Sequence, residues 1–122
     1  MTAQSLDYAT LARVVMPVFI YDGNGQGKPV EFCGTGFVIA RDVFVTCWHC
    51  VNKPLCEDHR YVAVTLTTEQ KAVPVVLENL ERDANGADLA AATIHTDVSL
   101  DFQLGSRQYI LMGHDVWTFG YP

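Results

Sequence analysis

Residues 34–51, GTGFVIARDVFVTCWHCV, decide the fold. Within them, two runs of β-branched and aromatic residues flank the pair Arg41-Asp42, a pattern that predicts two antiparallel strands joined by a tight turn. The second run leads into Thr46 and then into His49, which lies between two cysteines. The stretch therefore predicts a β-hairpin that ends on a histidine.

The rest of the chain also predicts strands. Apolar runs that alternate or are rich in β-branched residues recur at a spacing of roughly ten residues, bounded by turn-forming residues. They cover residues 14–21, 30–40, 43–47, 60–67, 71–77 and 89–95. Pro17 favours an edge position or an irregularity in its strand, and Pro74 favours an edge. These runs predict an all-β fold, an antiparallel six-stranded barrel or a sandwich.

Composition and charge are typical of one globular domain. The chain has 122 residues, of which 49% are hydrophobic and 18% charged, and its formal net charge is −6. This acidic balance excludes a basic nucleic-acid footprint, because a negative surface repels phosphates. No apolar run reaches about 18 residues, so no membrane span is expected. The N-terminal residues lack the pattern of a secretory signal, which predicts a cytoplasmic protein.

The run that ends on the histidine resembles a motif of the trypsin-like peptidases, which have the chymotrypsin fold. In that family a Gly-x-Gly strand, a hairpin and the run Thr-Ala-Ala-His-Cys carry the catalytic histidine. Thr46, His49 and Cys50 match that run, whereas Cys47 and Trp48 replace its two alanines.

Two later segments resemble the same family in the same order. Asp88-Leu89-Ala90 resembles the strand that supplies the catalytic aspartate, and GHDVWTFGYP, residues 113–122, resembles the segment that crosses to the second barrel. The resemblance implies a first barrel lobe of a double barrel over residues 1–104. It also implies a connector and the first strand of a second barrel over residues 105–122, so the chain is expected to be the first part of a longer enzyme.

The resemblance assigns His49 as the general base of peptide-bond hydrolysis and Asp88 as the carboxylate that orients it. A neutral imidazole takes a proton from the nucleophile and returns it to the leaving amine, while the carboxylate fixes the tautomer of the ring. Asp83 is the second candidate carboxylate, although no apolar strand follows it directly.

The family's nucleophile lies in a Gly-x-Ser-Gly run, and this chain has none. None of its serines, Ser5, Ser99 and Ser106, is followed by glycine. The resemblance therefore implies that a serine or cysteine nucleophile, the oxyanion hole and the specificity pocket lie on a second barrel, in cis or on another chain. This chain alone is expected to be inactive; the expected substrate is a polypeptide, and no cofactor is expected. A non-catalytic peptidase-like module that binds a partner is the alternative.

The cysteines support two further hypotheses. Cys47, Cys50, Cys56 and His59 have the spacing of four zinc ligands, so a small zinc-binding domain is a second alternative. The resemblance instead pairs Cys33 with Cys50, as a disulfide in secreted relatives or as two neighbouring thiols in a reducing cytosol.

Overall fold

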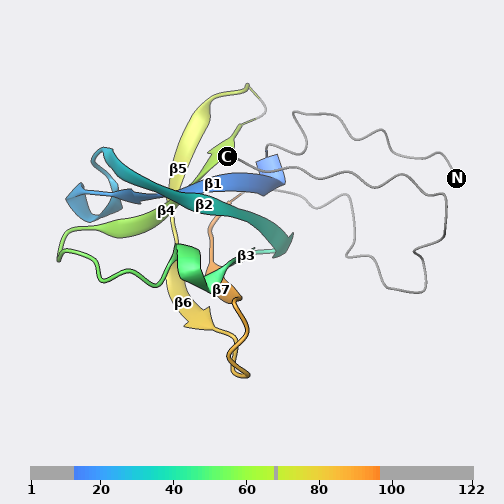
Figure 1. Cartoon of the computed structure of the whole chain (residues 1–122). Coiled ribbons are helices and arrows are strands. Elements are labelled where there is room, and N and C mark those ends of the chain that lie inside the picture. Colours follow the sequence, from blue (N-terminus) through green and yellow to red (C-terminus); the bar gives the residue numbers. More distant parts are fainter. Residues whose placement is uncertain (1–12, 68, 97–122) are drawn as a thin grey trace, which may run out of the picture.

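Alternating apolar runs build an all-β structure, as the sequence predicts. The computed structural model describes residues 13–67 and 69–96. In chain order these form β1 (Val15–Tyr21), η1 (Gly23–Gly25), β2 (Pro29–Ala40), β3 (Val43–Thr46), η2 (Trp48–Cys50), β4 (Arg60–Leu66), β5 (Ala72–Val76), β6 (Glu78–Arg82) and β7 (Ala90–Thr93), where η marks a short 3₁₀ helix. The seven strands form one curled antiparallel sheet in the order β5-β4-β1-β2-β3-β7-β6 (Figure 1).

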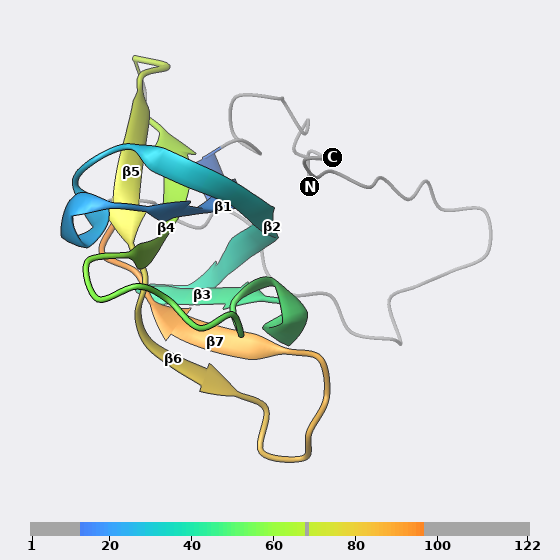
Figure 2. The ribbon, with the colours of Figure 1, turned by 60° about the vertical axis from the view of Figure 1, so that its left-hand side comes forward.

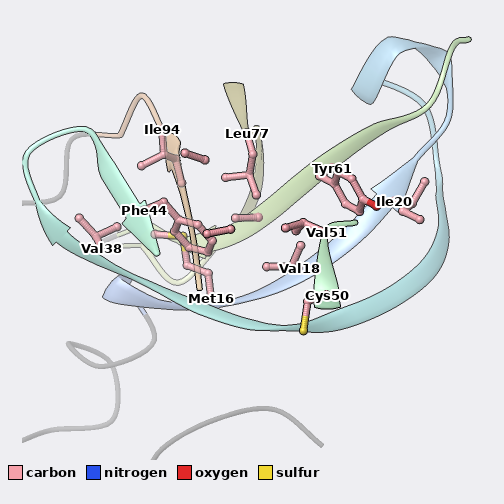
Figure 3. Packing of buried hydrophobic residues seen from close by; sticks show 13 residues of the cluster. Met16, Val18, Ile20, Val38, Phe44, Cys50, Val51, Tyr61, Leu77 and Ile94 are labelled. Carbon is pink, nitrogen blue, oxygen red and sulfur yellow. The ribbon is translucent and has the colours of Figure 1, made fainter. Parts of the chain in front are cut away.

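The hydrophobic core lies inside the curl of this sheet. In β1 the side chains of Met16, Val18 and Ile20 are buried and alternate with less buried neighbours, as the two-residue period of a strand requires. Figure 3 shows how these side chains converge with those of the other strands. The core cluster consists of Met16, Val18, Ile20, Val38, Phe44, Cys50, Val51, Tyr61, Ala63, Leu77, Ala90, Ala92 and Ile94.

The two outermost strands of the sheet follow each other along the chain. β5 pairs with β4 and β6 pairs with β7, and only Leu77 separates β5 from β6. Leu77 is buried, and its backbone N–H donates to the Tyr61 carbonyl oxygen at 2.9 Å. The sheet therefore curls into a half-barrel, and the chain passes from one outermost strand to the other through Leu77 (Figure 2).

The six predicted strands correspond to β1 to β5 and β7, whereas β6 was not predicted. Its sequence, ENLER, has four exposed residues around one half-buried leucine, so it lacks an apolar alternation. The described residues thus contain seven strands rather than six. The predicted connector and strand at residues 105–122 lie outside the described residues.

The prolines test the predicted edges. Pro74 lies in β5, an outermost strand, so its predicted edge position is confirmed. Pro17 lies in β1, an inner strand between β4 and β2, but the pairing of β1 with β4 runs only from Val18 to Tyr21, so Pro17 itself is paired on the β2 side alone. The other alternative for Pro17, an irregularity, occurs next to it, since the β1–β2 register shifts between Val18 and Phe19.

The predicted tight turn joins β2 and β3. Asp42 adopts a φ of 62°, a left-handed conformation that aspartate tolerates better than most residues with a side chain. No helix in the described part of the chain is long and apolar enough to cross a membrane.

Candidate functional site

The register of β3 and β7 brings His49 and Asp88 together. Thr46, the last residue of β3, pairs with Ala90, the first residue of β7. Because the strands are antiparallel, the chain that follows Thr46 and the chain that precedes Ala90 leave the sheet at the same end. His49 and Asp88 therefore meet there although 39 residues separate them in sequence. Figure 2 shows η2 at this end of the β3–β7 pair.

The turn that carries His49 is anchored by its neighbours in the core. Within η2, the N–H of Cys50 donates to the Cys47 carbonyl oxygen at 3.1 Å. Cys50 and Val51 are both buried, and a Cβ placed on Gly34 would lie only 2.5 Å from the Cys50 sulfur. Glycine at position 34 thus gives Cys50 room to pack, and His49 stays exposed beside it.

The second glycine of the motif also serves packing. A Cβ on Gly36 would lie 2.3 Å from the ring of Phe44, which is fully buried in the strand that leads to His49. At the end of that strand the Thr46 hydroxyl donates to the Thr35 carbonyl oxygen at 2.9 Å. These contacts fix the end of β3 from which η2 starts.

Asp88 binds His49 through both carboxylate oxygens. Asp88 Oδ1 accepts the backbone N–H of His49 at 2.8 Å, and Asp88 Oδ2 lies 2.5 Å from His49 Nδ1. These hydrogen bonds from His49 hold the pKa of Asp88 below its usual value, and the charge of Arg82 acts in the same direction. Because an ionised carboxylate only accepts hydrogen bonds, Nδ1 carries the proton of this bond.

The geometry leaves the other ring nitrogen open. His49 Nε2 has no hydrogen-bond partner among the residues that the structure describes. The His49 side chain is 68% exposed and that of Asp88 53% exposed. In a neutral ring the exposed Nε2 therefore has a lone pair that can accept a proton from a group approaching from outside the sheet.

Arg82, at the end of β6, connects the parts of the site, and sequence reasoning missed it. Its Nη2 donates to the Gly86 carbonyl oxygen at 2.8 Å, and its Nε donates to that of Ala87 at 3.5 Å. Its guanidinium also lies 5.7 Å from the ring centre of Trp48, the residue before His49. No sequence motif marks Arg82, because its partners are backbone carbonyls and a ring that only the fold brings near.

The second candidate carboxylate, Asp83, has a structural task instead. Its Oδ2 accepts the N–H groups of Asn85 at 3.0 Å and of Ala87 at 3.2 Å. A side-chain oxygen that binds the N–H two residues on stabilises a turn. Asp83 therefore shapes the loop between β6 and β7, while Asp88 is the carboxylate that reaches His49.

All four cysteines are free thiols in the structure. The disulfide between Cys33 and Cys50 is thus not formed, and the two cysteines are neighbouring thiols. Burial, then Glu31, raises the pKa of Cys33 from 9.0 to about 11, and nearby Cys50 contributes. Burial, followed by the nearby Cys47 and Asp88, also raises the pKa of Cys50.

The four residues of the alternative zinc site, Cys47, Cys50, Cys56 and His59, do not gather into one site. Cys50 packs in the core, and Cys56 and His59 lie in the loop before β4, where His59 is 3.7 Å from Asp58. The structure instead groups Cys47 with His49 and Asp88 within the described part of the chain.

The sequence was compared with protein-family models and with curated proteins. No protein-family model matches the chain, and no curated protein matches it in sequence. What the site can do chemically is therefore argued from its residues and their geometry.

Proposed function

We propose that this chain is the first barrel lobe of a trypsin-like serine endopeptidase and supplies two of its three catalytic residues. His49 is the general base and Asp88 is its orienting carboxylate. The observation that carries the proposal is the pair of hydrogen bonds that Asp88 makes to the ring and the backbone of His49. The bond to Nδ1 restrains the ring, and the bond to the backbone N–H fixes the carboxylate relative to the peptide of the histidine.

In the proposed reaction His49 takes up and gives back a proton in each of two steps, acylation and deacylation. Its Nε2 takes the proton from the hydroxyl or thiol of the nucleophile as that atom attacks the substrate carbonyl carbon. The imidazolium then gives this proton to the leaving amine nitrogen as the peptide bond breaks, and an acyl-enzyme remains. Water then attacks the carbonyl carbon of the acyl-enzyme while His49 Nε2 takes a proton from it. The imidazolium returns this proton to the oxygen or sulfur of the nucleophile as the acyl bond breaks and the acid leaves. Asp88 stays ionised throughout and stabilises the imidazolium.

The exposure of the pair supports a site completed by a second surface. A base must reach the nucleophile and the substrate, and the His49 side chain is 68% exposed on the open side of the pair. We propose that a second barrel, in cis or on another chain, brings the nucleophile, the oxyanion hole and the specificity pocket to this side.

The curled sheet supports the proposal at the level of the fold. When β5 and β6 are counted as one strand bent at Leu77, the sheet has the six strands expected of a chymotrypsin-like lobe. The proposed catalytic pair then joins η2, which carries His49, to the loop before β7, which carries Asp88, at one end of that sheet.

The test is hydrolysis of an unfolded polypeptide by the natural protein that contains this chain together with the second barrel. His49→Ala should abolish hydrolysis, and Asp88→Asn should lower kcat by about 10⁴-fold because it favours the wrong tautomer. His95→Ala and Asp83→Asn are the matched controls. His95 is also an exposed histidine paired with a carboxylate, and Asp83 lies in the same loop as Asp88.

Two results would count against the proposal. Unchanged hydrolysis by the His49→Ala protein would remove His49 from the chemistry. A complete natural protein without any hydrolysis, whose partner binding depends on this surface, would favour the non-catalytic module instead.

A further inference from the structure

Three side chains that can bind a metal converge at the exposed end of the β3–β7 pair. One ligand atom each from Cys47, His49 and Asp88 lies within 4.8 Å of the other two. Cys47 is the residue after β3, His49 lies in η2, and Asp88 precedes β7. All three residues are exposed, so an ion reaches them from solvent without disturbing the core.

The donor set fits zinc. Thiolate, imidazole and carboxylate are all zinc ligands, with bond lengths of about 2.0–2.3 Å, and a tetrahedral ion with such bonds holds its ligand atoms about 3.3–3.8 Å apart. That separation is below the 4.8 Å upper limit for these three atoms. If Nδ1 is the imidazole ligand, Nδ1 and Asp88 Oδ2, which now lie 2.5 Å apart, move apart by about 1 Å when the ion replaces the proton between them. The sulfur ligand disfavours magnesium and calcium, which select oxygen.

We propose that Cys47, His49 and Asp88 bind one Zn²⁺ ion, with water in the fourth position. Metal binding follows from the donor atoms alone and does not depend on the proposed function. Cys47 makes this set specific to the chain, because the motif that residues 46–50 resemble has alanine at that position. The set also differs from the four ligands that cysteine spacing suggests, with which it shares only Cys47.

The ion and the proposed catalysis exclude each other, a consequence that rests on the proposed function. The Cys47 thiol loses its proton to solvent when zinc binds. If zinc takes His49 Nδ1, it replaces the proton that now links the ring to Asp88. If it takes Nε2, it occupies the lone pair that would accept the proton of the nucleophile. Zinc therefore inhibits the proposed peptidase by binding His49, its general base.

The experiment measures metal binding by the reduced, metal-free 122-residue chain. Zn²⁺ is titrated in competition with a chromogenic chelator, and Co²⁺ serves as a probe because thiolate ligation produces a charge-transfer band in the near ultraviolet. One Zn²⁺ per chain is expected. Cys47→Ser should remove the Co²⁺–thiolate band and weaken Zn²⁺ binding by at least about 100-fold. Loss of a residue that only hydrogen-bonds to a metal ligand already weakens binding by up to about 100-fold, and loss of a ligand itself should cost at least as much.

Cys56→Ser is the matched control, because Cys56 is also an exposed thiol but lies outside the cluster. It should leave both readouts unchanged, and His49→Gln should weaken binding as Cys47→Ser does. Equal loss of binding in the Cys47→Ser and Cys56→Ser chains would overturn the proposal in favour of the four-ligand set. Zn²⁺ binding that is no tighter to the unchanged chain than to the Cys47→Ser chain would overturn it as well.

The inhibitory consequence is tested separately in the natural protein. The Zn²⁺ concentration that halves hydrolysis should rise at least about 100-fold in the Cys47→Ser protein, relative to the unchanged protein. An unchanged inhibitory concentration, with the metal site present in the isolated chain, would refute the consequence and leave the binding intact. A natural protein that binds Zn²⁺ but hydrolyses nothing would refute the proposed function alone.

Discussion

The four cysteines differ in their exposure to solvent, although three of them lie within ten residues of one another in sequence. Cys47 and Cys56 are exposed, whereas Cys50 is buried and Cys33 is partly buried. Burial disfavours the charged thiolate and raises the pKa of Cys33 from 9.0 to about 11. At neutral pH the thiolate fraction of Cys33 is therefore about 100-fold below that of an ordinary thiol.

This difference predicts the order of alkylation. In the metal-free, folded chain, iodoacetamide should modify Cys47 and Cys56 first, and Cys33 about 100-fold more slowly at neutral pH. Because the raised pKa leaves the thiol protonated up to high pH, the rate at Cys33 should still increase with pH until about 11. Peptide mapping by mass spectrometry measures each site, and the denatured chain is the control in which all four should react alike. Equal rates in the folded chain would contradict the placement of Cys33.

Single residues show how far the sequence determines the candidate site. His49 and Asp88 could be singled out because each lies in a short run of sequence that resembles a motif of a known family. Their exposure could not be predicted, since it depends on which surfaces the fold leaves open. The grouping of Cys47 with this pair depends on the β3–β7 register, which no local pattern encodes.

At the scale of elements, the β6–β7 hairpin positions the carboxylate of the site. Arg82 at the end of β6 binds two carbonyl oxygens of the connecting loop and makes a cation–π contact with Trp48. It thereby ties the loop that carries Asp88 to η2, which carries His49. Arg82 is a positioning residue, because it reaches the histidine only through these neighbours.

Arg82→Ala should loosen the contact between Asp88 and His49. The lost cation–π contact with Trp48 alone is worth about 0.5–1 kcal/mol at an exposed position. In nuclear magnetic resonance spectra, the Nδ1–H proton of His49 should exchange with water faster and its low-field signal should weaken. Arg60→Ala is the matched control, because Arg60 also binds carbonyl oxygens of its own loop, those of Glu57 and His59. An Nδ1–H signal that weakens equally in both variants would contradict the role of Arg82.

Elements also show why part of the fold escapes sequence analysis. β1 to β4 and β7 have buried residues at intervals or in short apolar runs, and β5 has an apolar sequence although its residues are exposed or half-buried, so the sequence predicts all six. β6 is polar, and it is a strand because β7 offers its backbone groups as partners. A strand that forms through backbone pairing and buries few side chains has no apolar pattern by which its sequence could predict it.

At the scale of the whole molecule, Leu77 holds the curl. It is the single residue between the two outermost strands, it packs in the core, and its N–H binds the Tyr61 carbonyl oxygen. A smaller side chain keeps that hydrogen bond but leaves a cavity where the two ends of the sheet meet.

Leu77→Ala should lower the free energy of unfolding of the chain by about 2–5 kcal/mol, as for other buried leucines. Leu89→Ala is the matched control, because the Leu89 side chain is 46% exposed and should change the free energy by less than about 0.5 kcal/mol. Urea unfolding followed by circular dichroism measures both. A loss at Leu77 no greater than that at Leu89 would show that the curl does not depend on this residue.

The continuity of β5 and β6 also bears on aggregation. The outer edge of a sheet can recruit a strand from a second molecule and so begin a fibril or a precipitate. Here both outer edges belong to residues 72–82. Pro74 lacks one of the N–H groups that a recruited strand would need, and β6 is short and carries the charged side chains of Glu78, Glu81 and Arg82, which are features typical of edge strands that resist pairing with other chains. One short segment therefore protects the described sheet against self-association from both sides.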